Sequence, residues 1–317
     1  MKNIQSKNNT VQHVEIDAGA DQQRLDNFLI ATLKGVPKSH IYRLIRSGQV
    51  RVNKGRARQT QRLQVGDIVR IPPVRTTTKT AVSTNNAALP NFEFLYQDDH
   101  LWVVNKPSGL AVHGGSGHSL GLIEALRAKY PQEKQLELVH RLDRDTSGAI
   151  IIARKRSTLR LMQRLLQDGG VDRRYWLLAQ GFTKQQSTIE APLLRQDEAG
   201  KRKMIISKAG RSAKTNFREL GKGGGYQLIE AELITGRTHQ IRVHAQFGGF
   251  PIVGDDRYGN AANDEAFAVQ YGFVALPLFL HARQLQFRHP HAGEKIMIEA
   301  PLDSSFQRAL KALSISY

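Results

Sequence analysis

A run of five apolar residues at positions 149–153, AIIIA, directly follows the polar stretch HRLDRDTSG at 140–148. A short apolar run of this kind predicts a buried strand. A polar loop beside a rigid strand is well suited to hold a reactive group. The same residues also fit a tight turn, in which Asp and Ser satisfy backbone amides and Gly148 adopts an unusual backbone angle. Spacing alone leaves both interpretations open.

The chain is strongly basic, with a net charge of +18 over 317 residues. This excess predicts a polyanionic partner, nucleic acid ahead of an anionic membrane. We expect no membrane association, because no long uncharged apolar segment exists and the first thirty residues lack the apolar core of a signal peptide. The absence of cysteine excludes disulfides, thiolate catalysis and cysteine-ligated zinc. A cytoplasmic location follows as an expectation.

Residues 21–75 have the pattern of a small domain with two helices followed by short strands. The pattern becomes helical from Asp21, with one apolar stripe formed by Leu25, Phe28, Leu29 and Leu33, and Ser39 is expected to cap a second helix. Alternating residues at 49–53 and 67–71 predict the strands. The polar residues 1–20 are expected to form a mobile tail, with a short piece at 11–16 able to become an edge strand.

Positive charge is concentrated in this domain, where positions 24–75 hold twelve lysines or arginines against two acids. Basic side chains are usually just solvated, but the imbalance here is too large for mixed surface ion pairs. The order RLDNFL, SxxYRLIRxGxVxVN and LxxGDxVxI resembles the S4 domain, an RNA-binding module with an α-L fold. The resemblance implies phosphate contacts that position RNA without reading its sequence. The residues implied to make these phosphate contacts are Lys38, Arg43, Arg46 and Lys54.

Residues 76–91 are rich in Thr, Ser, Asn and Ala without periodicity, which is typical of a flexible linker. Such a linker would tether the small domain and raise the local concentration of RNA at a second domain, residues 92–317. The segment 195–214 of this domain is very basic and is either a second phosphate-contacting strip or a solvated loop.

Besides the block PIVGDDRYG at 251–259, three segments of the second domain resemble the RluA-type pseudouridine synthases. The first is HRLDRDTSG, which matches the family signature HRLDxxTSG at each specified position. The second contains Tyr175 and has Arg173 where lysine is common, so the charge is kept. The third, TGRTHQIRVH at 235–244, matches without departure. The resemblance implies an α+β fold, with a mixed, mostly antiparallel β-sheet in the catalytic domain.

The resemblance also implies roles for individual residues. Asp143 is implied to be the catalytic carboxylate, acting on the sugar either as a nucleophile or as a base. Arg242 is implied to keep Asp143 charged and oriented, and Tyr175 to stack on the target uracil. The base must be flipped out of folded RNA, and Arg141 is implied to fill the space it leaves. His140 is expected to contact RNA beside it.

No cofactor or metal is expected. The glycine-rich loop 114–117 lacks both the ending of a P-loop and the spacing of a dinucleotide site. The three histidines between positions 281 and 291 lack an acidic partner at ligand spacing, so structural roles are preferred for them.

The resemblance therefore implies an enzyme that isomerises uridine to pseudouridine in RNA, and we expect it to be a monomer. Residues 35–39 and 112–117 look most like the family's C-type, which acts on 23S ribosomal RNA, so more than one uridine is expected to be modified. The alternative is a non-catalytic S4-type RNA-binding or ribosome-assembly protein, which charge and the S4 domain fit equally well. The presence of Asp143, Tyr175 and Arg242 within matching motifs argues against that alternative.

Overall fold

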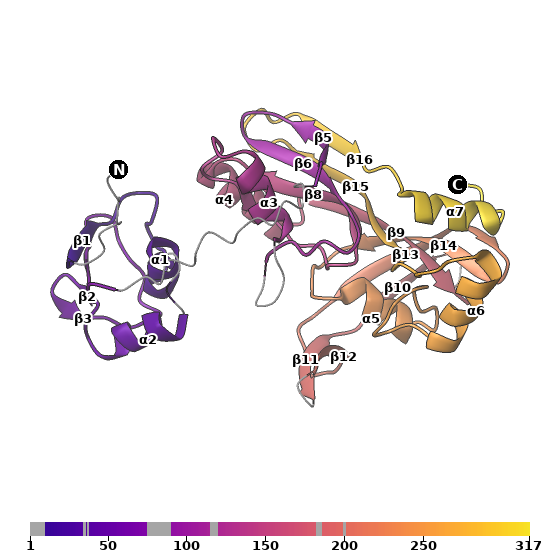
Figure 1. The fold of residues 1–317 in the computed structure, drawn as a ribbon, viewed down its shortest axis with the longest axis horizontal. Helices are drawn as coiled ribbons and strands as arrows, with labels where there is room; N and C mark the ends of the chain where they lie inside the picture. Colours follow the sequence, from indigo (N-terminus) through magenta and orange to yellow (C-terminus); the bar gives the residue numbers. More distant parts are fainter. Residues whose placement is uncertain are drawn as a thin grey trace, which may run out of the picture. The chain divides into compact units, whose positions relative to one another are not determined.

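The computed structural model describes residues 10–33, 36, 38–74, 90–114, 120–181, 186–198 and 201–317. The chain forms two compact units, Met1–Ala88 and Leu89–Tyr317 (Figure 1). Nearly all of the predicted linker at 76–91, the first nine residues of the predicted tail and most of the glycine-rich loop at 114–117 lie outside the described residues.

The N-terminal unit combines two helices with a four-stranded sheet of order β1-β4-β2-β3. Its elements are β1 (Gln12–Glu15), α1 (Leu25–Thr32), α2 (Lys38–Arg46), β2 (Arg51–Val52), β3 (Gly55–Arg56) and β4 (Ile68–Ile71). The strand expected within residues 11–16 is confirmed, because β1 pairs antiparallel with β4 at the edge of the sheet.

Three local predictions in this unit were wrong. The first helix begins at Leu25 rather than near Asp21, because Gln22 has a left-handed backbone (φ 58°) and its amide bonds to the Leu63 carbonyl. The second helix already includes Lys38, so Ser39 lies inside its first turn instead of capping it. The strand expected at 49–53 shortens to β2, because Asn53 and Lys54, with φ of 49° and 66°, turn the chain toward β3.

The C-terminal unit is organised around a ten-stranded sheet of order β10-β13-β14-β9-β15-β8-β6-β5, with β16 beside β15 and β7 beside β8. Among the described strand pairs of this sheet, the pairing of β15 with β8 is parallel and the others are antiparallel. The predicted mixed, mostly antiparallel sheet is thus confirmed. The elements are β5 (Glu93–Gln97), β6 (Leu101–Lys106), α3 (Leu122–Lys129), β7 (Glu137–Leu138), β8 (Ser147–Ala153), α4 (Arg156–Gln167), β9 (Val171–Gln180), β10 (Gln186–Glu190), β11 (Leu193–Glu198), β12 (Lys201–Ile206), β13 (Lys214–Gly223), β14 (Tyr226–Leu233), α5 (Gln240–Phe247), α6 (Ala261–Tyr271), β15 (Leu280–Arg288), β16 (Lys295–Glu299) and α7 (Ser304–Ala312).

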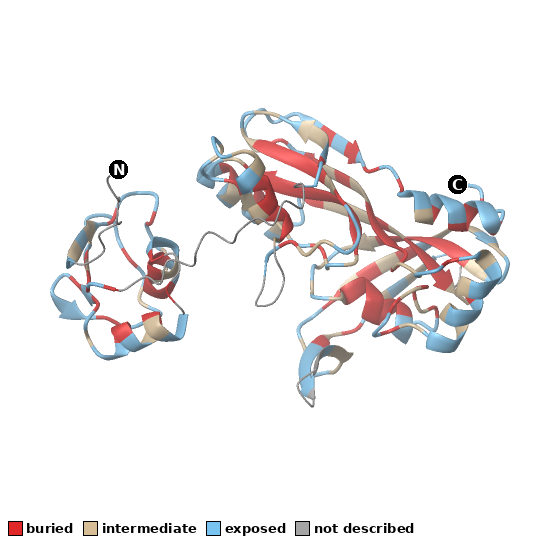
Figure 2. Cartoon of the chain, in the orientation of Figure 1, coloured by how far each residue is buried: buried red, intermediate tan, exposed pale blue. Residues whose placement is uncertain are grey.

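The predicted buried strand is β8, and all seven of its residues are buried (Figure 2). Ile150 and Ile152 pack into one apolar cluster, while Ala149 and Ile151 pack into another, so β8 is covered on both faces. Gly148 at its start has a φ of 105°, and a Cβ there would lie 2.4 Å from the carbonyl oxygen of Ala282 on β15. The unusual backbone angle expected of Gly148 is thus present, and the parallel pairing with β15 leaves no room for a side chain.

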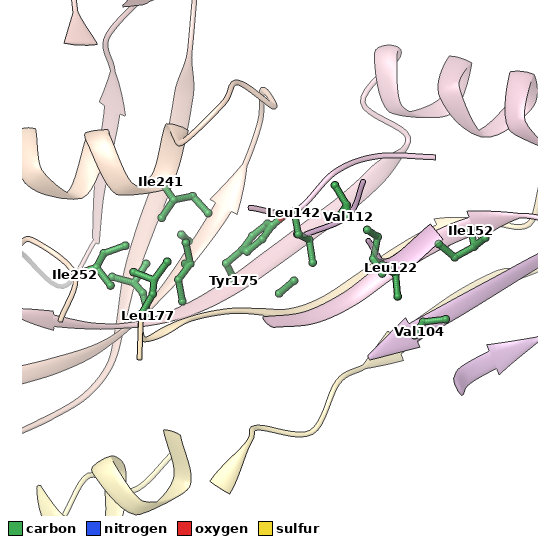
Figure 3. Packing of buried hydrophobic residues seen from close by; sticks show 14 of the residues in the cluster. Val104, Val112, Leu122, Leu142, Ile152, Tyr175, Leu177, Ile241 and Ile252 are labelled. Carbon is green, nitrogen blue, oxygen red and sulfur yellow. The ribbon is translucent and has the colours of Figure 1, made fainter. Parts of the chain in front are cut away.

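The larger apolar cluster joins three segments that are far apart in the sequence. Leu142 follows His140 and Arg141, Tyr175 lies in β9, and Ile241 lies in α5; all three pack in this one cluster (Figure 3). The polar residues beside each of these anchors are therefore held at fixed positions relative to one another.

Candidate active site

A cavity of about 750 Å³ opens where these three segments meet. It is lined by residues 138–143 and 233–242, and by side chains from three further elements. The volume falls within the roughly 300–1,000 Å³ usual for ligand pockets. The remaining lining residues are His113, Thr146, Gln163, Leu166, Gln167, Arg173, Tyr175 and Leu280.

Lys106, the last residue of β6, anchors the loop at 140–146, which precedes β8. The Lys106 side chain is fully buried, and its Nζ donates hydrogen bonds to the carbonyl oxygens of Pro107, Leu110 and Arg144 at 2.8–2.9 Å. Burial lowers the pKa of Lys106 to about 7, against the opposing pull of Asp145 and Asp143. Residues 105–109 have the sequence pattern of a turn, and the pattern did not predict that Lys106 anchors this loop.

Asp143 lies in the cavity wall with its side chain 25% exposed, so the carboxylate is open to a bound molecule. Its Oδ2 is 3.5 Å from Nη1 of Arg242 and 3.8 Å from Nε2 of His239. The Asp143 and Arg242 side chains, 99 positions apart in the chain, are thus brought together. The approach of His239 had not been predicted.

Arg242 is held more closely by Asp255 than by Asp143. Its Nε and Nη2 donate to the two carboxylate oxygens of buried Asp255 at 2.7 and 2.6 Å, and Nη2 also reaches Asp256 at 3.1 Å. Burial alone would raise the pKa of Asp255, but the Arg242 hydrogen bonds and charge hold it below its usual value. Asp255 therefore fixes the guanidinium and leaves Nη1 pointing toward Asp143. The signal that could have found Asp255 is its place in the block at 251–259, which resembles the same family.

Tyr175 lines the cavity from β9 and is 6% exposed. Burial raises its pKa to about 12, with the negative charge of Asp143 adding to the effect and Arg173 opposing it. The hydroxyl is therefore protonated at neutral pH and is available as a hydrogen-bond donor.

Arg141 and His140, adjacent in the loop, differ in where their side chains lie. Arg141 is exposed at the cavity. The His140 ring accepts a hydrogen bond at Nε2 from the Ile151 amide at 3.1 Å, so that nitrogen is bound to β8. Burial and the nearby Arg173 charge lower the pKa of His140 to about 3, which keeps the ring neutral. This placement favours a role for His140 in holding the loop in position, rather than the RNA contact that was expected of it.

The basic residues predicted for the S4 domain belong to the N-terminal unit. Ile41, Leu44 and Ile45 of α2 are buried in the core of this unit. Lys38, Arg43 and Arg46 of the same helix are exposed to solvent, and Lys54 is exposed in the turn between β2 and β3. These four residues are therefore available to a ligand of the N-terminal unit.

The histidines near the C-terminal end take part in hydrogen bonds within the fold. His281 contacts the Ser147 hydroxyl at 2.8 Å, and His291 contacts the Thr158 hydroxyl at 3.0 Å. The Nδ1 atom of His289 accepts a hydrogen bond from the Ala292 amide. Within the ranges that the structure describes, no group of three or more His, Cys, Asp or Glu residues is arranged to hold a metal ion. In the same ranges, no helix has the length and apolar composition needed to cross a membrane.

Comparisons with known proteins match both units. The family model for RNA pseudouridylate synthase matches residues 100–247, and that for the S4 domain matches residues 23–69. Ribosomal large subunit pseudouridine synthase C of Salmonella typhimurium is 47% identical over 311 residues, covering 96% of this chain and 97% of its own. The protein of the same name from Haemophilus ducreyi is 48% identical over 310 residues, covering 96% of each chain.

A solved structure is similar as well. Human RNA Pseudouridylate Synthase Domain Containing 4 aligns with a TM-score of 0.59 and 27% identity, over 71% of this chain and 94% of its own. The resemblance inferred from the motifs is thus confirmed over nearly the whole length. The chain carries an S4 domain at residues 23–69 and belongs to the RluA-type family of RNA pseudouridine synthases.

Proposed function

We propose that this chain converts uridine to pseudouridine in 23S ribosomal RNA, and that it modifies more than one uridine. The names of its relatives support the large ribosomal subunit as the target. The observation that carries the chemistry is the Asp143 carboxylate, open to a cavity and faced by a buried guanidinium from Arg242.

The reaction breaks the N1–C1′ bond of uridine, rotates the uracil and joins C5 to C1′. C5 then loses its proton and N1 gains one, so the change is an isomerisation without an oxidant or an energy source. Asp143 acts in its ionised form, either by attacking C1′ or by removing a proton from the sugar. Arg242 stabilises that ionised form, because its guanidinium is 3.5 Å away and is held in place by Asp255.

The cavity also provides for the uracil ring. A uridine in folded RNA must leave its stack to reach Asp143, at a cost of a few kcal/mol. Tyr175 offers an aromatic face and a protonated hydroxyl beside the carboxylate. Arg141, exposed at the cavity, takes the place that the base leaves, since a guanidinium plane stacks well on neighbouring bases.

The N-terminal unit is proposed to bind RNA phosphates through Lys38, Arg43, Arg46 and Lys54, all exposed. These contacts position the RNA but do not select the uridine. The segment at 76–91 is proposed to act as the tether that keeps the bound RNA close to the cavity.

The proposal is tested by mapping pseudouridines in the 23S ribosomal RNA of a strain that lacks this gene. Reintroducing the wild-type gene should restore the missing sites, while Asp143→Asn should not. The matched control is Asp145→Asn, because Asp145 pairs with Arg144 at 2.9 Å and does not line the cavity. Restoration by Asp143→Asn, or an unchanged map in the deletion strain, would contradict the proposal.

A further inference from the structure

The hydrogen bonds around Tyr258 determine which nitrogen of His239 carries a proton. Tyr258 is 1% exposed, and its hydroxyl accepts a hydrogen bond from the Met204 amide at 3.0 Å. The same hydroxyl lies 2.9 Å from Nδ1 of His239. A buried hydroxyl hydrogen needs an acceptor, and in the described part of the chain Nδ1 is the one within reach. Tyr258 therefore donates to Nδ1, and the ring proton of a neutral His239 sits on Nε2.

The ring of His239 is neutral at neutral pH. Burial lowers its pKa, while Asp143 and Asp255 oppose this effect and the charges of Arg242 and Arg257 reinforce it. Its Nε2–H is thus directed at Asp143, whose Oδ2 lies 3.8 Å away. That distance is longer than a hydrogen bond, but such contacts often tighten only when substrate binds.

The backbone at His239 directs the ring toward the cavity. His239 precedes α5 and has a left-handed conformation, with φ of 54° and ψ of 20°. Residues other than glycine adopt this region at a cost, and such strain is often kept at functional sites. The closest approaches of both His239 and Arg242 to Asp143 are at Oδ2. The second oxygen, Oδ1, is then left for the reacting atom.

We propose that His239 is a positioning residue for Asp143, acting as a neutral Nε2–H donor whose tautomer is set by Tyr258. The inference rests on the proposed role of Asp143. Tyr258 also connects the site to strand β12, which contains Lys203 and Met204. The Met204 amide donates to the Tyr258 hydroxyl, and the Lys203 ammonium is 5.3 Å from the centre of the Tyr258 ring.

Three variants of the full-length protein test this proposal. His239→Asn removes the Nε2 donor while tolerating the left-handed backbone. His239→Gln places an amide nitrogen at the same number of bonds from Cα as Nε2, so it restores a donor. Tyr258→Phe removes the hydroxyl that sets the tautomer. Tyr271→Phe is the matched control, because Tyr271 lies in α6 outside the cavity lining. Thermal unfolding checks that each variant is folded.

The activity readout is the single-turnover rate on 23S ribosomal RNA transcribed in vitro, with the half-saturating RNA concentration measured separately. His239→Asn should lower the rate about a hundredfold, a loss that a misplacement of the reacting group by ~1 Å can cause. The half-saturating concentration should not change, His239→Gln should regain part of the loss, and Tyr271→Phe should match wild type. A wild-type rate for His239→Asn, beside an inactive Asp143→Asn, would overturn the inference and leave the proposed function intact.

The second readout is the tautomer itself, from imidazole nitrogen NMR shifts of protein with labelled histidine. The His239 signal, assigned by its loss in His239→Asn, should show a proton on Nε2 in the wild type and a mixture of tautomers in Tyr258→Phe. A proton on Nδ1 in the wild type would refute the inference. This measurement does not depend on turnover, so it separates failure of the inference from failure of the proposed function.

Discussion

Asp255→Asn removes the negative charge that holds the buried guanidinium of Arg242. Asp255 contacts Arg242 with both oxygens, and its side chain is fully buried. Removing one partner of a buried ion pair typically costs roughly 3–5 kcal/mol, because the remaining charge is left uncompensated. Asp256 and Asp143 stay beside the guanidinium at 3.1 and 3.5 Å. We therefore expect the lower end of that range, about 3 kcal/mol of unfolding free energy.

The loss should depend on pH in a defined direction. Because Arg242 keeps the pKa of Asp255 below its usual value, this carboxyl binds a proton less readily in the folded chain than in the unfolded chain. Its contribution is complete above the unfolded pKa of about 3.9 and is lost as pH falls through the lower folded value. The difference between wild type and Asp255→Asn should thus be constant near neutral pH and shrink below about pH 4.

Urea unfolding followed by tryptophan fluorescence measures this free energy. The chain has two tryptophans, Trp102 in β6 and Trp176 in β9, so the signal reports on the C-terminal unit alone. The control is Asp256→Asn, whose side chain is 68% exposed and should cost less than about 1 kcal/mol. Equal losses in the two variants, or a loss for Asp255→Asn that persists unchanged at acid pH, would refute the reasoning.

Three further predictions concern other parts of the chain. Arg242→Lys should retain part of the turnover rate and Arg242→Met less, because a point charge meets the electrostatic need without the planar fork; single-turnover rates measure the difference. Gly148→Ala should reduce the yield of folded protein, seen by thermal unfolding, since a Cβ would lie 2.4 Å from the Ala282 carbonyl oxygen. Deleting residues 1–75 should weaken RNA binding and flatten its dependence on salt in a filter-binding titration, as basic side chains leave with the segment; unaltered binding would contradict the proposed role of the N-terminal unit.

The cavity residues that could be predicted from the sequence are those that stand in a contiguous motif. Asp143, Tyr175 and Arg242 could be named because each stands in a segment that resembles the family, and the structure brings all three to one cavity. The buried strand β8 was also predictable, because a run of five apolar residues is too short for most helices and is typical of a buried strand.

The partners of these residues could not be predicted in the same way. The pairing of Arg242 with Asp255 depends on how the segment after α5 folds back against that helix, which periodicity does not reveal. Lys106 looked like a turn residue, and only the packing of the loop at 140–146 over it makes it a buried donor. His140 was expected at RNA, but its ring nitrogen serves the Ile151 amide. Tertiary contacts decide each of these cases.

The position of β15 has a consequence for the time at which the protein becomes active during its synthesis. This strand separates β8, which follows Asp143, from β9, which carries Tyr175. It is made after both of them, because its residues Leu280–Arg288 follow β8 and β9 in the chain. At about 5–20 residues per second of translation, β15 is made several seconds after β9. Until β15 has been made, β8 and β9 lack the strand that lies between them, and the cavity lacks the wall that Leu280 of β15 contributes.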